Sequence, residues 1–250
     1  MFNKLFTVLI CCMAMTTIVA AQDVTTMVKN ADQFRLNSKS AKVVSLVSLF
    51  ENGQLDKTRQ YNVYTRENRE SLVIFKSPVE AGQKMLMLGD NYWLVMPKSR
   101  RPIRITPMQK LLGEASVGDI STLTWSEDYQ ASWVSNETIE SDLQAVKANR
   151  LRLSANTSGA SYEAIDLWLD AKDDFPIKAD LYLRSGKLAK QAWFTRGERE
   201  GQTGVTQMTL LDQIQPAKKT VIEYQAITPM ALEDKYYNPA YLVRNAIAEL

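Results

Sequence analysis

The side chains that most often carry enzymatic chemistry are nearly absent from this chain of 250 residues. It has no histidine, and its two cysteines, Cys11 and Cys12, lie in an N-terminal segment that we expect to be removed. Histidine and cysteine are the usual nucleophiles, general bases and zinc ligands near neutral pH. The mature chain therefore excludes Ser-His-Asp and Cys-His catalysis, histidine metal sites and disulfide bonds, which favours binding over catalysis.

Carboxylates could still do hydrolytic chemistry, because glycosidases need only a pair of acids. The adjacent candidates are Asp173 with Asp174 and Glu198 with Glu200, and both pairs fall in predicted hairpin turns, where acids are usually solvated. The sequence has no G-x-S-x-G, S-x-x-K, GKS/GKT or G-x-G-x-x-G motif. We therefore predict a protein that is not an enzyme and has no catalytic residue, metal or cofactor; a carboxylate hydrolase stays an alternative.

A run of cations lies before the middle of the chain, and no acid interrupts it between Asp90 and Glu114. It is either a solvated loop or a rim that attracts anionic head groups or an acidic partner, where each exposed charge near such a membrane is worth about 1 kcal/mol. With 30 Lys and Arg against 28 Asp and Glu, the whole chain is close to neutral, so we predict no nucleic-acid partner. The run consists of Lys98, Arg100, Arg101 and Arg104.

Two predicted strands carry apolar residues on both faces. Residues 83–88 alternate Met85 and Met87 with two leucines, and residues 91–96 place Trp93 and Val95 opposite an equally apolar set, Tyr92, Leu94 and Met96. Both faces need cover from a core, a helix or a ligand. Methionine suits surfaces that accommodate apolar partners of varying shape, although it also fills irregular cores.

The elements that position these residues follow from the periodicity of the apolar residues. Apolar residues at three- and four-residue spacing after Asp23 predict a helix over 24–34. From Lys42 onward the period is two, and short turns rich in Asn, Asp and Gly favour consecutive antiparallel strands. We predict strands over 42–51, 57–66, 69–77, 83–88, 91–96, 129–139, 144–154, 161–170, 176–184, 187–195, 204–212 and 218–227.

Two stretches depart from this strand pattern within what we predict to be a single domain over 22–250. Residues 97–128 form a long insertion with short helical turns expected at 108–112 and 120–123, and such insertions often act as lids or binding loops. At the C-terminus, Asn238 can cap a helix whose first position is Pro239. One face of that helix would carry Leu242, Val243, Ala246, Ile247 and Leu250.

Residues 1–21 have the layout of a secretory signal peptide. Lys4 precedes an apolar stretch that is short for a spanning helix, and Val19 and Ala21 precede Gln22. A lipoprotein signal needs a small residue before its cysteine, but Ile10 precedes the first cysteine. We therefore expect cleavage after Ala21 and export; an uncleaved anchor is the alternative.

Three motifs resemble those of a known family. They are Met87-Leu-Gly-Asp-Asn-Tyr-Trp-Leu-Val-Met-Pro97, then Arg100-Arg101-Pro-Ile-Arg104-Ile, then Leu112-Gly-Glu-Ala-Ser-Val-Gly-Asp-Ile120. Together they resemble the outer-membrane lipoprotein-sorting proteins of the LolA-like superfamily, with Val95 in place of the usual tyrosine. The resemblance implies a mainly β fold: a strongly curved antiparallel sheet forming an incomplete, half-open β-barrel, with an N-terminal helix, short lid helices and a C-terminal helix.

The resemblance also implies a function and a set of site residues. It predicts a soluble periplasmic carrier that holds the acyl chains of lipoproteins or lipids, receives them from an inner-membrane transporter of the ABC or RND type and passes them to an outer-membrane acceptor. An envelope sensor or accessory transporter subunit is the alternative. Exposing one long acyl chain to water costs on the order of 10 kcal/mol, so a carrier needs an apolar cavity. We expect this cavity and its lid at Met85, Met87, Trp93, Val95, Met108, Leu111 and Leu112, with Arg100, Arg101 and Arg104 as its polar rim.

Overall fold

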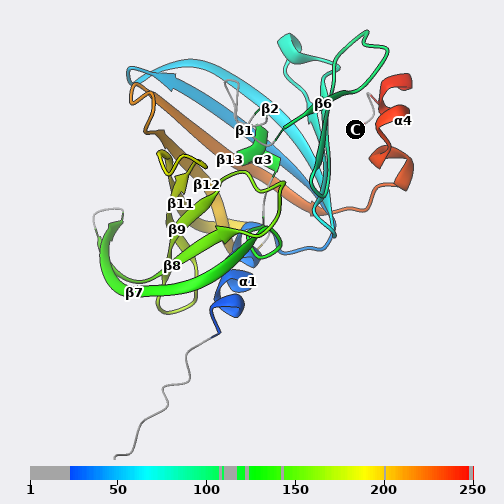
Figure 1. The fold of residues 1–250 in the computed structure, drawn as a ribbon. Helices are drawn as coiled ribbons and strands as arrows, with labels where there is room; N and C mark the ends of the chain where they lie inside the picture. The colour runs from blue at the N-terminus through cyan, green and yellow to red at the C-terminus, as the bar shows by residue number, and fades with distance from the viewer. Residues whose placement is uncertain are drawn as a thin grey trace, which may run out of the picture.

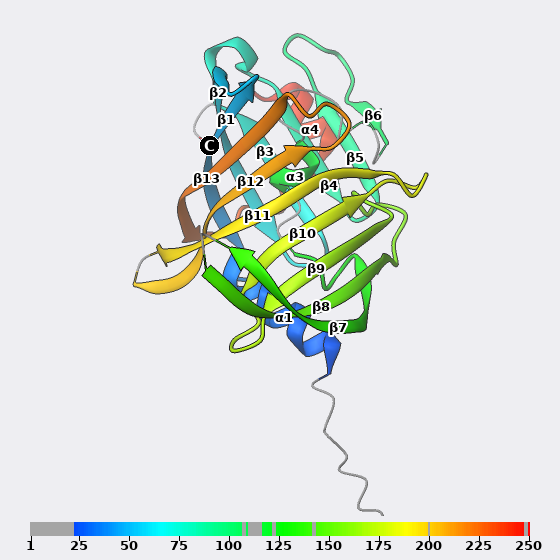
Figure 2. The ribbon, with the colours of Figure 1, turned by 90° about the vertical axis from the view of Figure 1, so that its left-hand side faces the viewer.

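The described residues form one curved antiparallel sheet of 13 strands. The computed structural model describes residues 23–106, 109, 117–121, 124–141, 144–199, 201–247 and 250. The strand order is β6-β5-β4-β3-β2-β1-β13-β12-β11-β10-β9-β8-β7, so every neighbouring pair is consecutive in the chain except β1 with β13. The sheet curls into a half-barrel whose edge strands, β6 and β7, do not pair (Figures 1 and 2). The predicted mainly β, half-open architecture is confirmed.

The strands follow the predicted segments with small shifts. Their bounds are β1 Ala41–Glu51, β2 Gln54–Arg66, β3 Glu70–Phe75, β4 Lys84–Leu88, β5 Asn91–Val95, β6 Ile103–Ile105, β7 Tyr129–Ser141, β8 Gln144–Ala155, β9 Ala164–Asp170, β10 Pro176–Tyr182, β11 Leu188–Arg199, β12 Gln202–Asp212 and β13 Lys218–Pro229. One strand was not predicted. β6 lies inside the insertion that we expected to be irregular, and it pairs with β5 over three residues.

Alternation along each strand decides which side chains face the interior. In β1, every second residue from Ala41 to Leu49 is buried, Ser45 included, while the residues that alternate with them are partly exposed. Because successive side chains of a strand point to opposite faces, this alternation gives the sheet an apolar concave side. The main hydrophobic core lies there and draws residues from strands across the sheet.

Two helices cover the concave side. α1 (Val24–Arg35) begins where the apolar spacing predicts, and the side chain of Asp23 caps it by accepting a hydrogen bond from the Thr25 N–H. Its residues Met27 and Ala31 are fully buried at one end of the half-barrel (Figure 2). α3 (Val117–Ser121) lies inside the curve of the sheet and brings Ile120 into the core. The helical turn expected at 120–123 therefore begins earlier, and residues 122 and 123 lie outside the described part.

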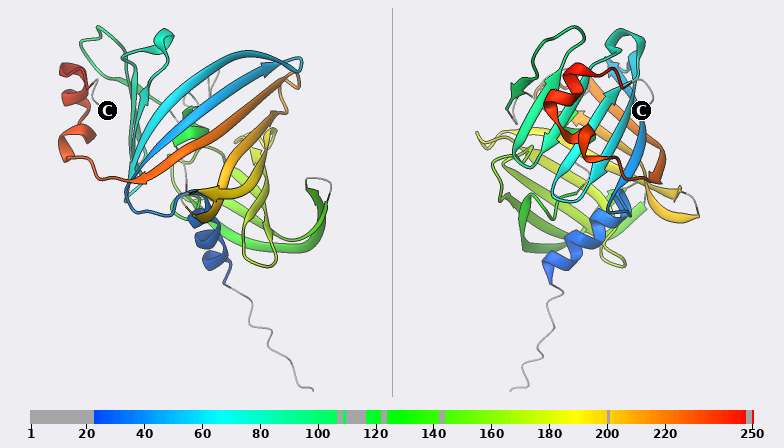
Figure 3. Two further views of the ribbon diagram at one scale, coloured as in Figure 1. Left: turned by 180° about the vertical axis from the view of Figure 1, so that it is seen from behind. Right: turned by 90° about the vertical axis from the view of Figure 1, so that its right-hand side faces the viewer.

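The C-terminal segment crosses the convex side of β3, β4 and β5 (Figure 3). It contains two short helices, η2 (Asp234–Tyr237) and α4 (Pro239–Arg244). Asn238 caps α4 by accepting hydrogen bonds from two backbone N–H groups, which confirms the predicted start. The predicted extension of the helix to Leu250 is wrong: the helix ends at Arg244, and Asn245 is extended. Residues 78–80 form a further single turn, η1 (Pro78–Glu80).

The predicted signal peptide, residues 1–21, lies outside the described part of the chain. Within the described residues, no helix is long and apolar enough to cross a membrane.

Candidate functional site: the concave face and its plug

The concave face is a continuous apolar wall across the described strands. Cross-strand neighbours in an antiparallel sheet point to the same side, so the register identifies its members. Val63 pairs with Val73, Val73 with Met85, and Met85 with Leu94. The same wall continues on the other half of the sheet through Leu151, Leu153, Ile165, Leu167, Leu181, Phe194, Met208, Leu210 and Ile222.

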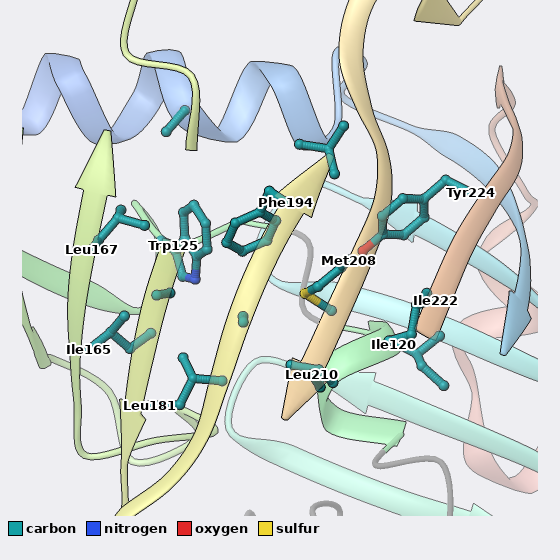
Figure 4. Close-up of a cluster of buried hydrophobic side chains, with 14 of the residues drawn as sticks. Ile120, Trp125, Ile165, Leu167, Leu181, Phe194, Met208, Leu210, Ile222 and Tyr224 are labelled. Atoms are coloured by element: carbon teal, nitrogen blue, oxygen red, sulfur yellow. The ribbon is translucent and has the colours of Figure 1, made fainter. Parts of the chain in front are cut away.

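A small plug, which consists of α3 and Trp125, occupies the centre of this wall. Ile120 of α3 is fully buried against it, and Trp125 packs edge-on against Phe194 with ring centroids 5.6 Å apart (Figure 4). Beside Trp125 and Phe194 there is a cavity of about 30 Å³. That volume is far below the roughly 300–1,000 Å³ of a typical small-molecule site. This cavity cannot hold an acyl chain unless the plug moves.

A buried ion pair links α3 to the sheet. The Asp119 carboxylate lies 2.5 Å from the Lys190 Nζ of β11 and accepts a hydrogen bond of 2.7 Å from the Tyr162 hydroxyl. The Asp119 side chain is 4% exposed and that of Lys190 is 14% exposed. Burial, followed by the charge of Asp119, raises the pKa of Tyr162 well above its ordinary value, so this hydroxyl keeps its proton. We call Asp119, Lys190 and Tyr162 the latch.

A second polar link joins α1 to the segment that follows α3. The carboxylate of Asp32 accepts hydrogen bonds from the backbone N–H groups of Trp125 and Ser126, at 2.7 and 2.9 Å. The guanidinium of Arg35 lies 4.0 Å from the centre of the Trp125 ring, a cation–π contact. Burial raises the pKa of Asp32 to about 6, although the hydrogen bonds and Arg35 oppose the shift. The plug is thus held through buried polar groups as well as apolar contacts.

An arginine clamp ties distant loops together at one end of the half-barrel. Nη2 of Arg69 lies 2.6 Å from a carboxylate oxygen of Asp90 and 2.6 Å from one of Asp128. The backbone N–H of Gly159 donates to Asp90, and a Cβ at this glycine would lie 2.7 Å from the same carboxylate oxygen. The clamp therefore joins the β4–β5 turn to the start of β7 and to the loop after β8.

Large apolar side chains remain exposed on the concave side of both edge strands. Ile103 of β6 pairs with Leu94, and Trp133 of β7 pairs with the fully buried Leu151, so both point to the concave side. Each is 48% exposed. The apolar wall thus reaches solvent at both free edges of the sheet.

The structure separates the strand residues that we predicted to bind together. Met85 and Met87 lie on the concave side, whereas Trp93 and Val95 lie on the convex side among the residues that contact the C-terminal segment. The cause is the two-residue turn Gly89-Asp90, which pairs Met87 with Tyr92 and Leu86 with Trp93. Tyr92 and Leu94, the reverse choice, share the face of the two methionines. Ligand binding by any of these residues stays a prediction.

The other predicted site residues are placed as follows. Arg104 stacks over the Trp93 ring at 5.1 Å and donates to the Asn91 side chain, so it lies on the convex side. Arg100 and Arg101 are exposed in the turn before β6. The predicted lid residues Met108, Leu111 and Leu112 lie outside the described residues.

The latch was not predicted from the sequence, although Asp119 lies in one of the motifs that resemble the family. Lys190 lies on the same side of β11 as Ala192 and Phe194, which are buried. A cation at such an inward position was the one sign in the sequence that a buried carboxylate would pair with it. In the described residues, no group of three His, Cys, Asp or Glu residues is placed to hold a metal ion.

Comparisons with known proteins place this geometry in a family. A family model described as "Uncharacterized protein" matches residues 67–244. The crystal structure of a LolA superfamily protein from Nitrosomonas europaea superposes with a TM-score of 0.77 at 25% identity, over 86% of this chain and 97% of that one. The chain belongs to the LolA superfamily.

Two further solved structures share the LolA superfamily fold. A DUF1329 family protein from Desulfovibrio piger gives a TM-score of 0.69 at 20% identity, over 87% of this chain and 97% of that one. A putative outer membrane lipoprotein-sorting protein domain from Vibrio parahaemolyticus gives a TM-score of 0.68 at 20% identity, over 88% of this chain and 98% of that one. No curated protein matches the sequence.

Proposed function

We propose that this LolA superfamily protein is a carrier that binds the acyl chains of lipoproteins or lipids on the concave face of its half-barrel. The observation that carries the proposal is a continuous apolar wall, exposed at both free edges and occupied at its centre by a short helix. The relative from Vibrio parahaemolyticus is described as a putative outer membrane lipoprotein-sorting protein domain, which supports this ligand class.

The proposed route begins with export of the protein through the segment 1–21 and cleavage after Ala21. In the periplasm the carrier receives its cargo from an inner-membrane transporter of the ABC or RND type and delivers it to an outer-membrane acceptor. Transport needs no reaction at the carrier itself, because the carrier only replaces water around the acyl chain.

The energetics of loading favour exchange of the plug for the cargo. Burying one methylene is worth about 0.8 kcal/mol, so a long acyl chain supplies about 10 kcal/mol or more. The chain must displace α3 and Trp125, whose side chains now cover the same wall. The ligand and the plug therefore compete for one surface, which permits release as well as uptake.

Native mass spectrometry of the gently purified protein, with lipid extraction, tests the proposal. We expect acyl-chain adducts on the wild type and clear depletion of them in Ile103→Asp and Trp133→Asp, which place a charge on the exposed part of the concave wall. Leu55→Asp is the matched control, because Leu55 is an exposed apolar residue on β2 at 58% exposure. A protein without adducts that also binds no fluorescent fatty acid would refute the carrier and favour the sensor or accessory subunit.

A further inference from the structure

The convex side holds a groove that the carrier function does not use. It has a volume of about 450 Å³ and lies between the convex side of β3–β5 and the C-terminal segment. Small-molecule sites in proteins usually have volumes of about 300–1,000 Å³. The groove is therefore large enough for a ligand. The sheet separates the C-terminal segment, which forms one wall of the groove, from α3 (Figures 1 and 3).

The walls of the groove are mainly apolar. The sheet contributes Ile74 and Val95, and the C-terminal segment contributes Leu242, Val243 and Ile247. These residues belong to the convex hydrophobic cluster, so the groove is a gap within an apolar contact. An alkyl chain placed there would contact apolar groups from both the sheet and the segment.

Lysines gather at one end of the groove because of the strand order. β3 ends, β4 begins and β5 ends at the same side of the sheet, so Lys76, Lys84 and Lys98 are brought together there. The described residues that line the groove include these cations and no acid. Lys84 is buried and donates to the carbonyls of Leu242 and Asn245, which positions α4 on the sheet.

The other two lysines are available to a ligand from solvent. Lys76 and Lys98 are both exposed, and among the described residues neither pairs with an Asp or Glu carboxylate. Lys76 donates to the Leu250 oxygen at 3.4 Å, a long contact that a carboxylate ligand would replace. An exposed ammonium next to an apolar groove is complementary to an anionic head group carried on an alkyl chain. The groove therefore offers both parts of an amphiphile site.

We propose that this groove binds a single-chain anionic amphiphile of the fatty-acid type. Its alkyl chain lies along Ile74, Val95, Leu242 and Ile247, and its carboxylate lies at Lys76 and Lys98. This site is on the opposite side of the sheet from the proposed cargo site, so each site can be lost without the other.

Methyl NMR during titration with dodecanoate below its micelle concentration tests the proposal. We expect shifts at the methyl groups of Val95, Leu242 and Ile247, with binding weakened about fivefold by Lys98→Glu and again by Lys76→Glu, as for exposed ion pairs. Lys187→Glu makes the same charge change at an exposed lysine outside the groove and leaves the binding unchanged. Dodecanol, which lacks the carboxylate, should bind about fivefold more weakly than dodecanoate. Its affinity should be the same for the wild type and for both lysine variants.

A second variant separates this site from the concave one. Ala246→Trp fills the groove from its exposed wall and abolishes these shifts, whereas Trp133→Asp leaves them intact. Shifts confined to concave methyl groups such as Met85, or equal affinity for dodecanoate and dodecanol, would overturn the groove proposal. Binding to anionic vesicles without binding of dodecanoate would also overturn it, because a membrane surface would then be the partner.

Discussion

Removal of the cation from the latch, by Lys190→Met, is expected to open the plug rather than to unfold the protein. The substitution keeps an unbranched side chain of similar length but leaves the Asp119 carboxylate buried without its cation. Loss of one partner from a buried ion pair usually costs about 3–5 kcal/mol, because the remaining charge is uncompensated. Tyr162 still donates to Asp119, so we expect a smaller penalty of about 2 kcal/mol in the closed state.

This penalty is relieved if α3 leaves the concave face, since Asp119 then reaches water. A destabilisation of the closed state by about 2 kcal/mol raises the open population relative to the closed one about 30-fold. The apparent affinity for an acyl ligand that needs the open state rises by up to the same factor, until the open state predominates. Displacement of a fluorescent fatty acid measures the affinity, and hydrogen exchange over residues 117–121 measures the opening.

The double variant Asp119→Asn/Lys190→Met is the matched control. It removes both charges and keeps a group that can bond to Tyr162, so its affinity should return to within a few-fold of the wild type. The reasoning is refuted if Lys190→Met leaves affinity and exchange unchanged while the free energy of unfolding falls by the full penalty. In that case α3 would be a fixed part of the core.

Three further predictions concern stability. Because burial raises the Asp32 pKa to about 6, the folded chain binds a proton that the unfolded chain has lost, and stability from this group falls by about 2 kcal/mol as pH rises from 4 to 6. Asp32→Asn should remove that loss. In urea titrations, the free energy of unfolding of the variant relative to that of the wild type should therefore be higher at pH 7 than at pH 4; the same difference at both pH values would contradict the prediction. Arg69→Met should lower the free energy of unfolding by about 3–5 kcal/mol, because Asp128 is left buried without its cation; a loss below 1 kcal/mol in urea titration would show that the clamp is not coupled to folding. Leu242→Ala should destabilise the packing of the C-terminal segment on the sheet by about 2–5 kcal/mol. Hydrogen exchange should then become faster over residues 234–247 and stay the same in β9–β11; unchanged exchange over 234–247 would mean that other contacts hold the segment.

Much of the fold could be predicted from the sequence because alternation and turn chemistry are local. β1 shows both: its inward residues alternate, and Asn52-Gly53 supplies the positive φ angles of its hairpin. β6 was missed because three residues are too few to show a period. The C-terminal helix was predicted too long because its apolar spacing continues past Arg244, although the helix ends there and Asn245 is extended.

The site was harder to predict than the fold. β5 is apolar on both faces, so its composition did not indicate which face is concave. The turn Gly89-Asp90 did hold that information, since a two-residue loop places Met87 opposite Tyr92. The latch is different in kind: Asp119 and Lys190 are distant in the chain and meet only after the sheet has curved.

The seam between β1 and β13 has a consequence for how the molecule forms. All other strand pairs join consecutive strands and can form as hairpins while the chain is still being synthesised, but Ala41 in β1 cannot pair until Pro229 in β13 is present. Closing so long a loop is entropically costly, and non-local pairings slow folding. Until then each of the two separate meanders exposes one additional unpaired backbone edge, at β1 and at β13, and such edges promote aggregation. Nearly the whole chain must therefore be available before the half-barrel exists, and the last strand, β13, completes it.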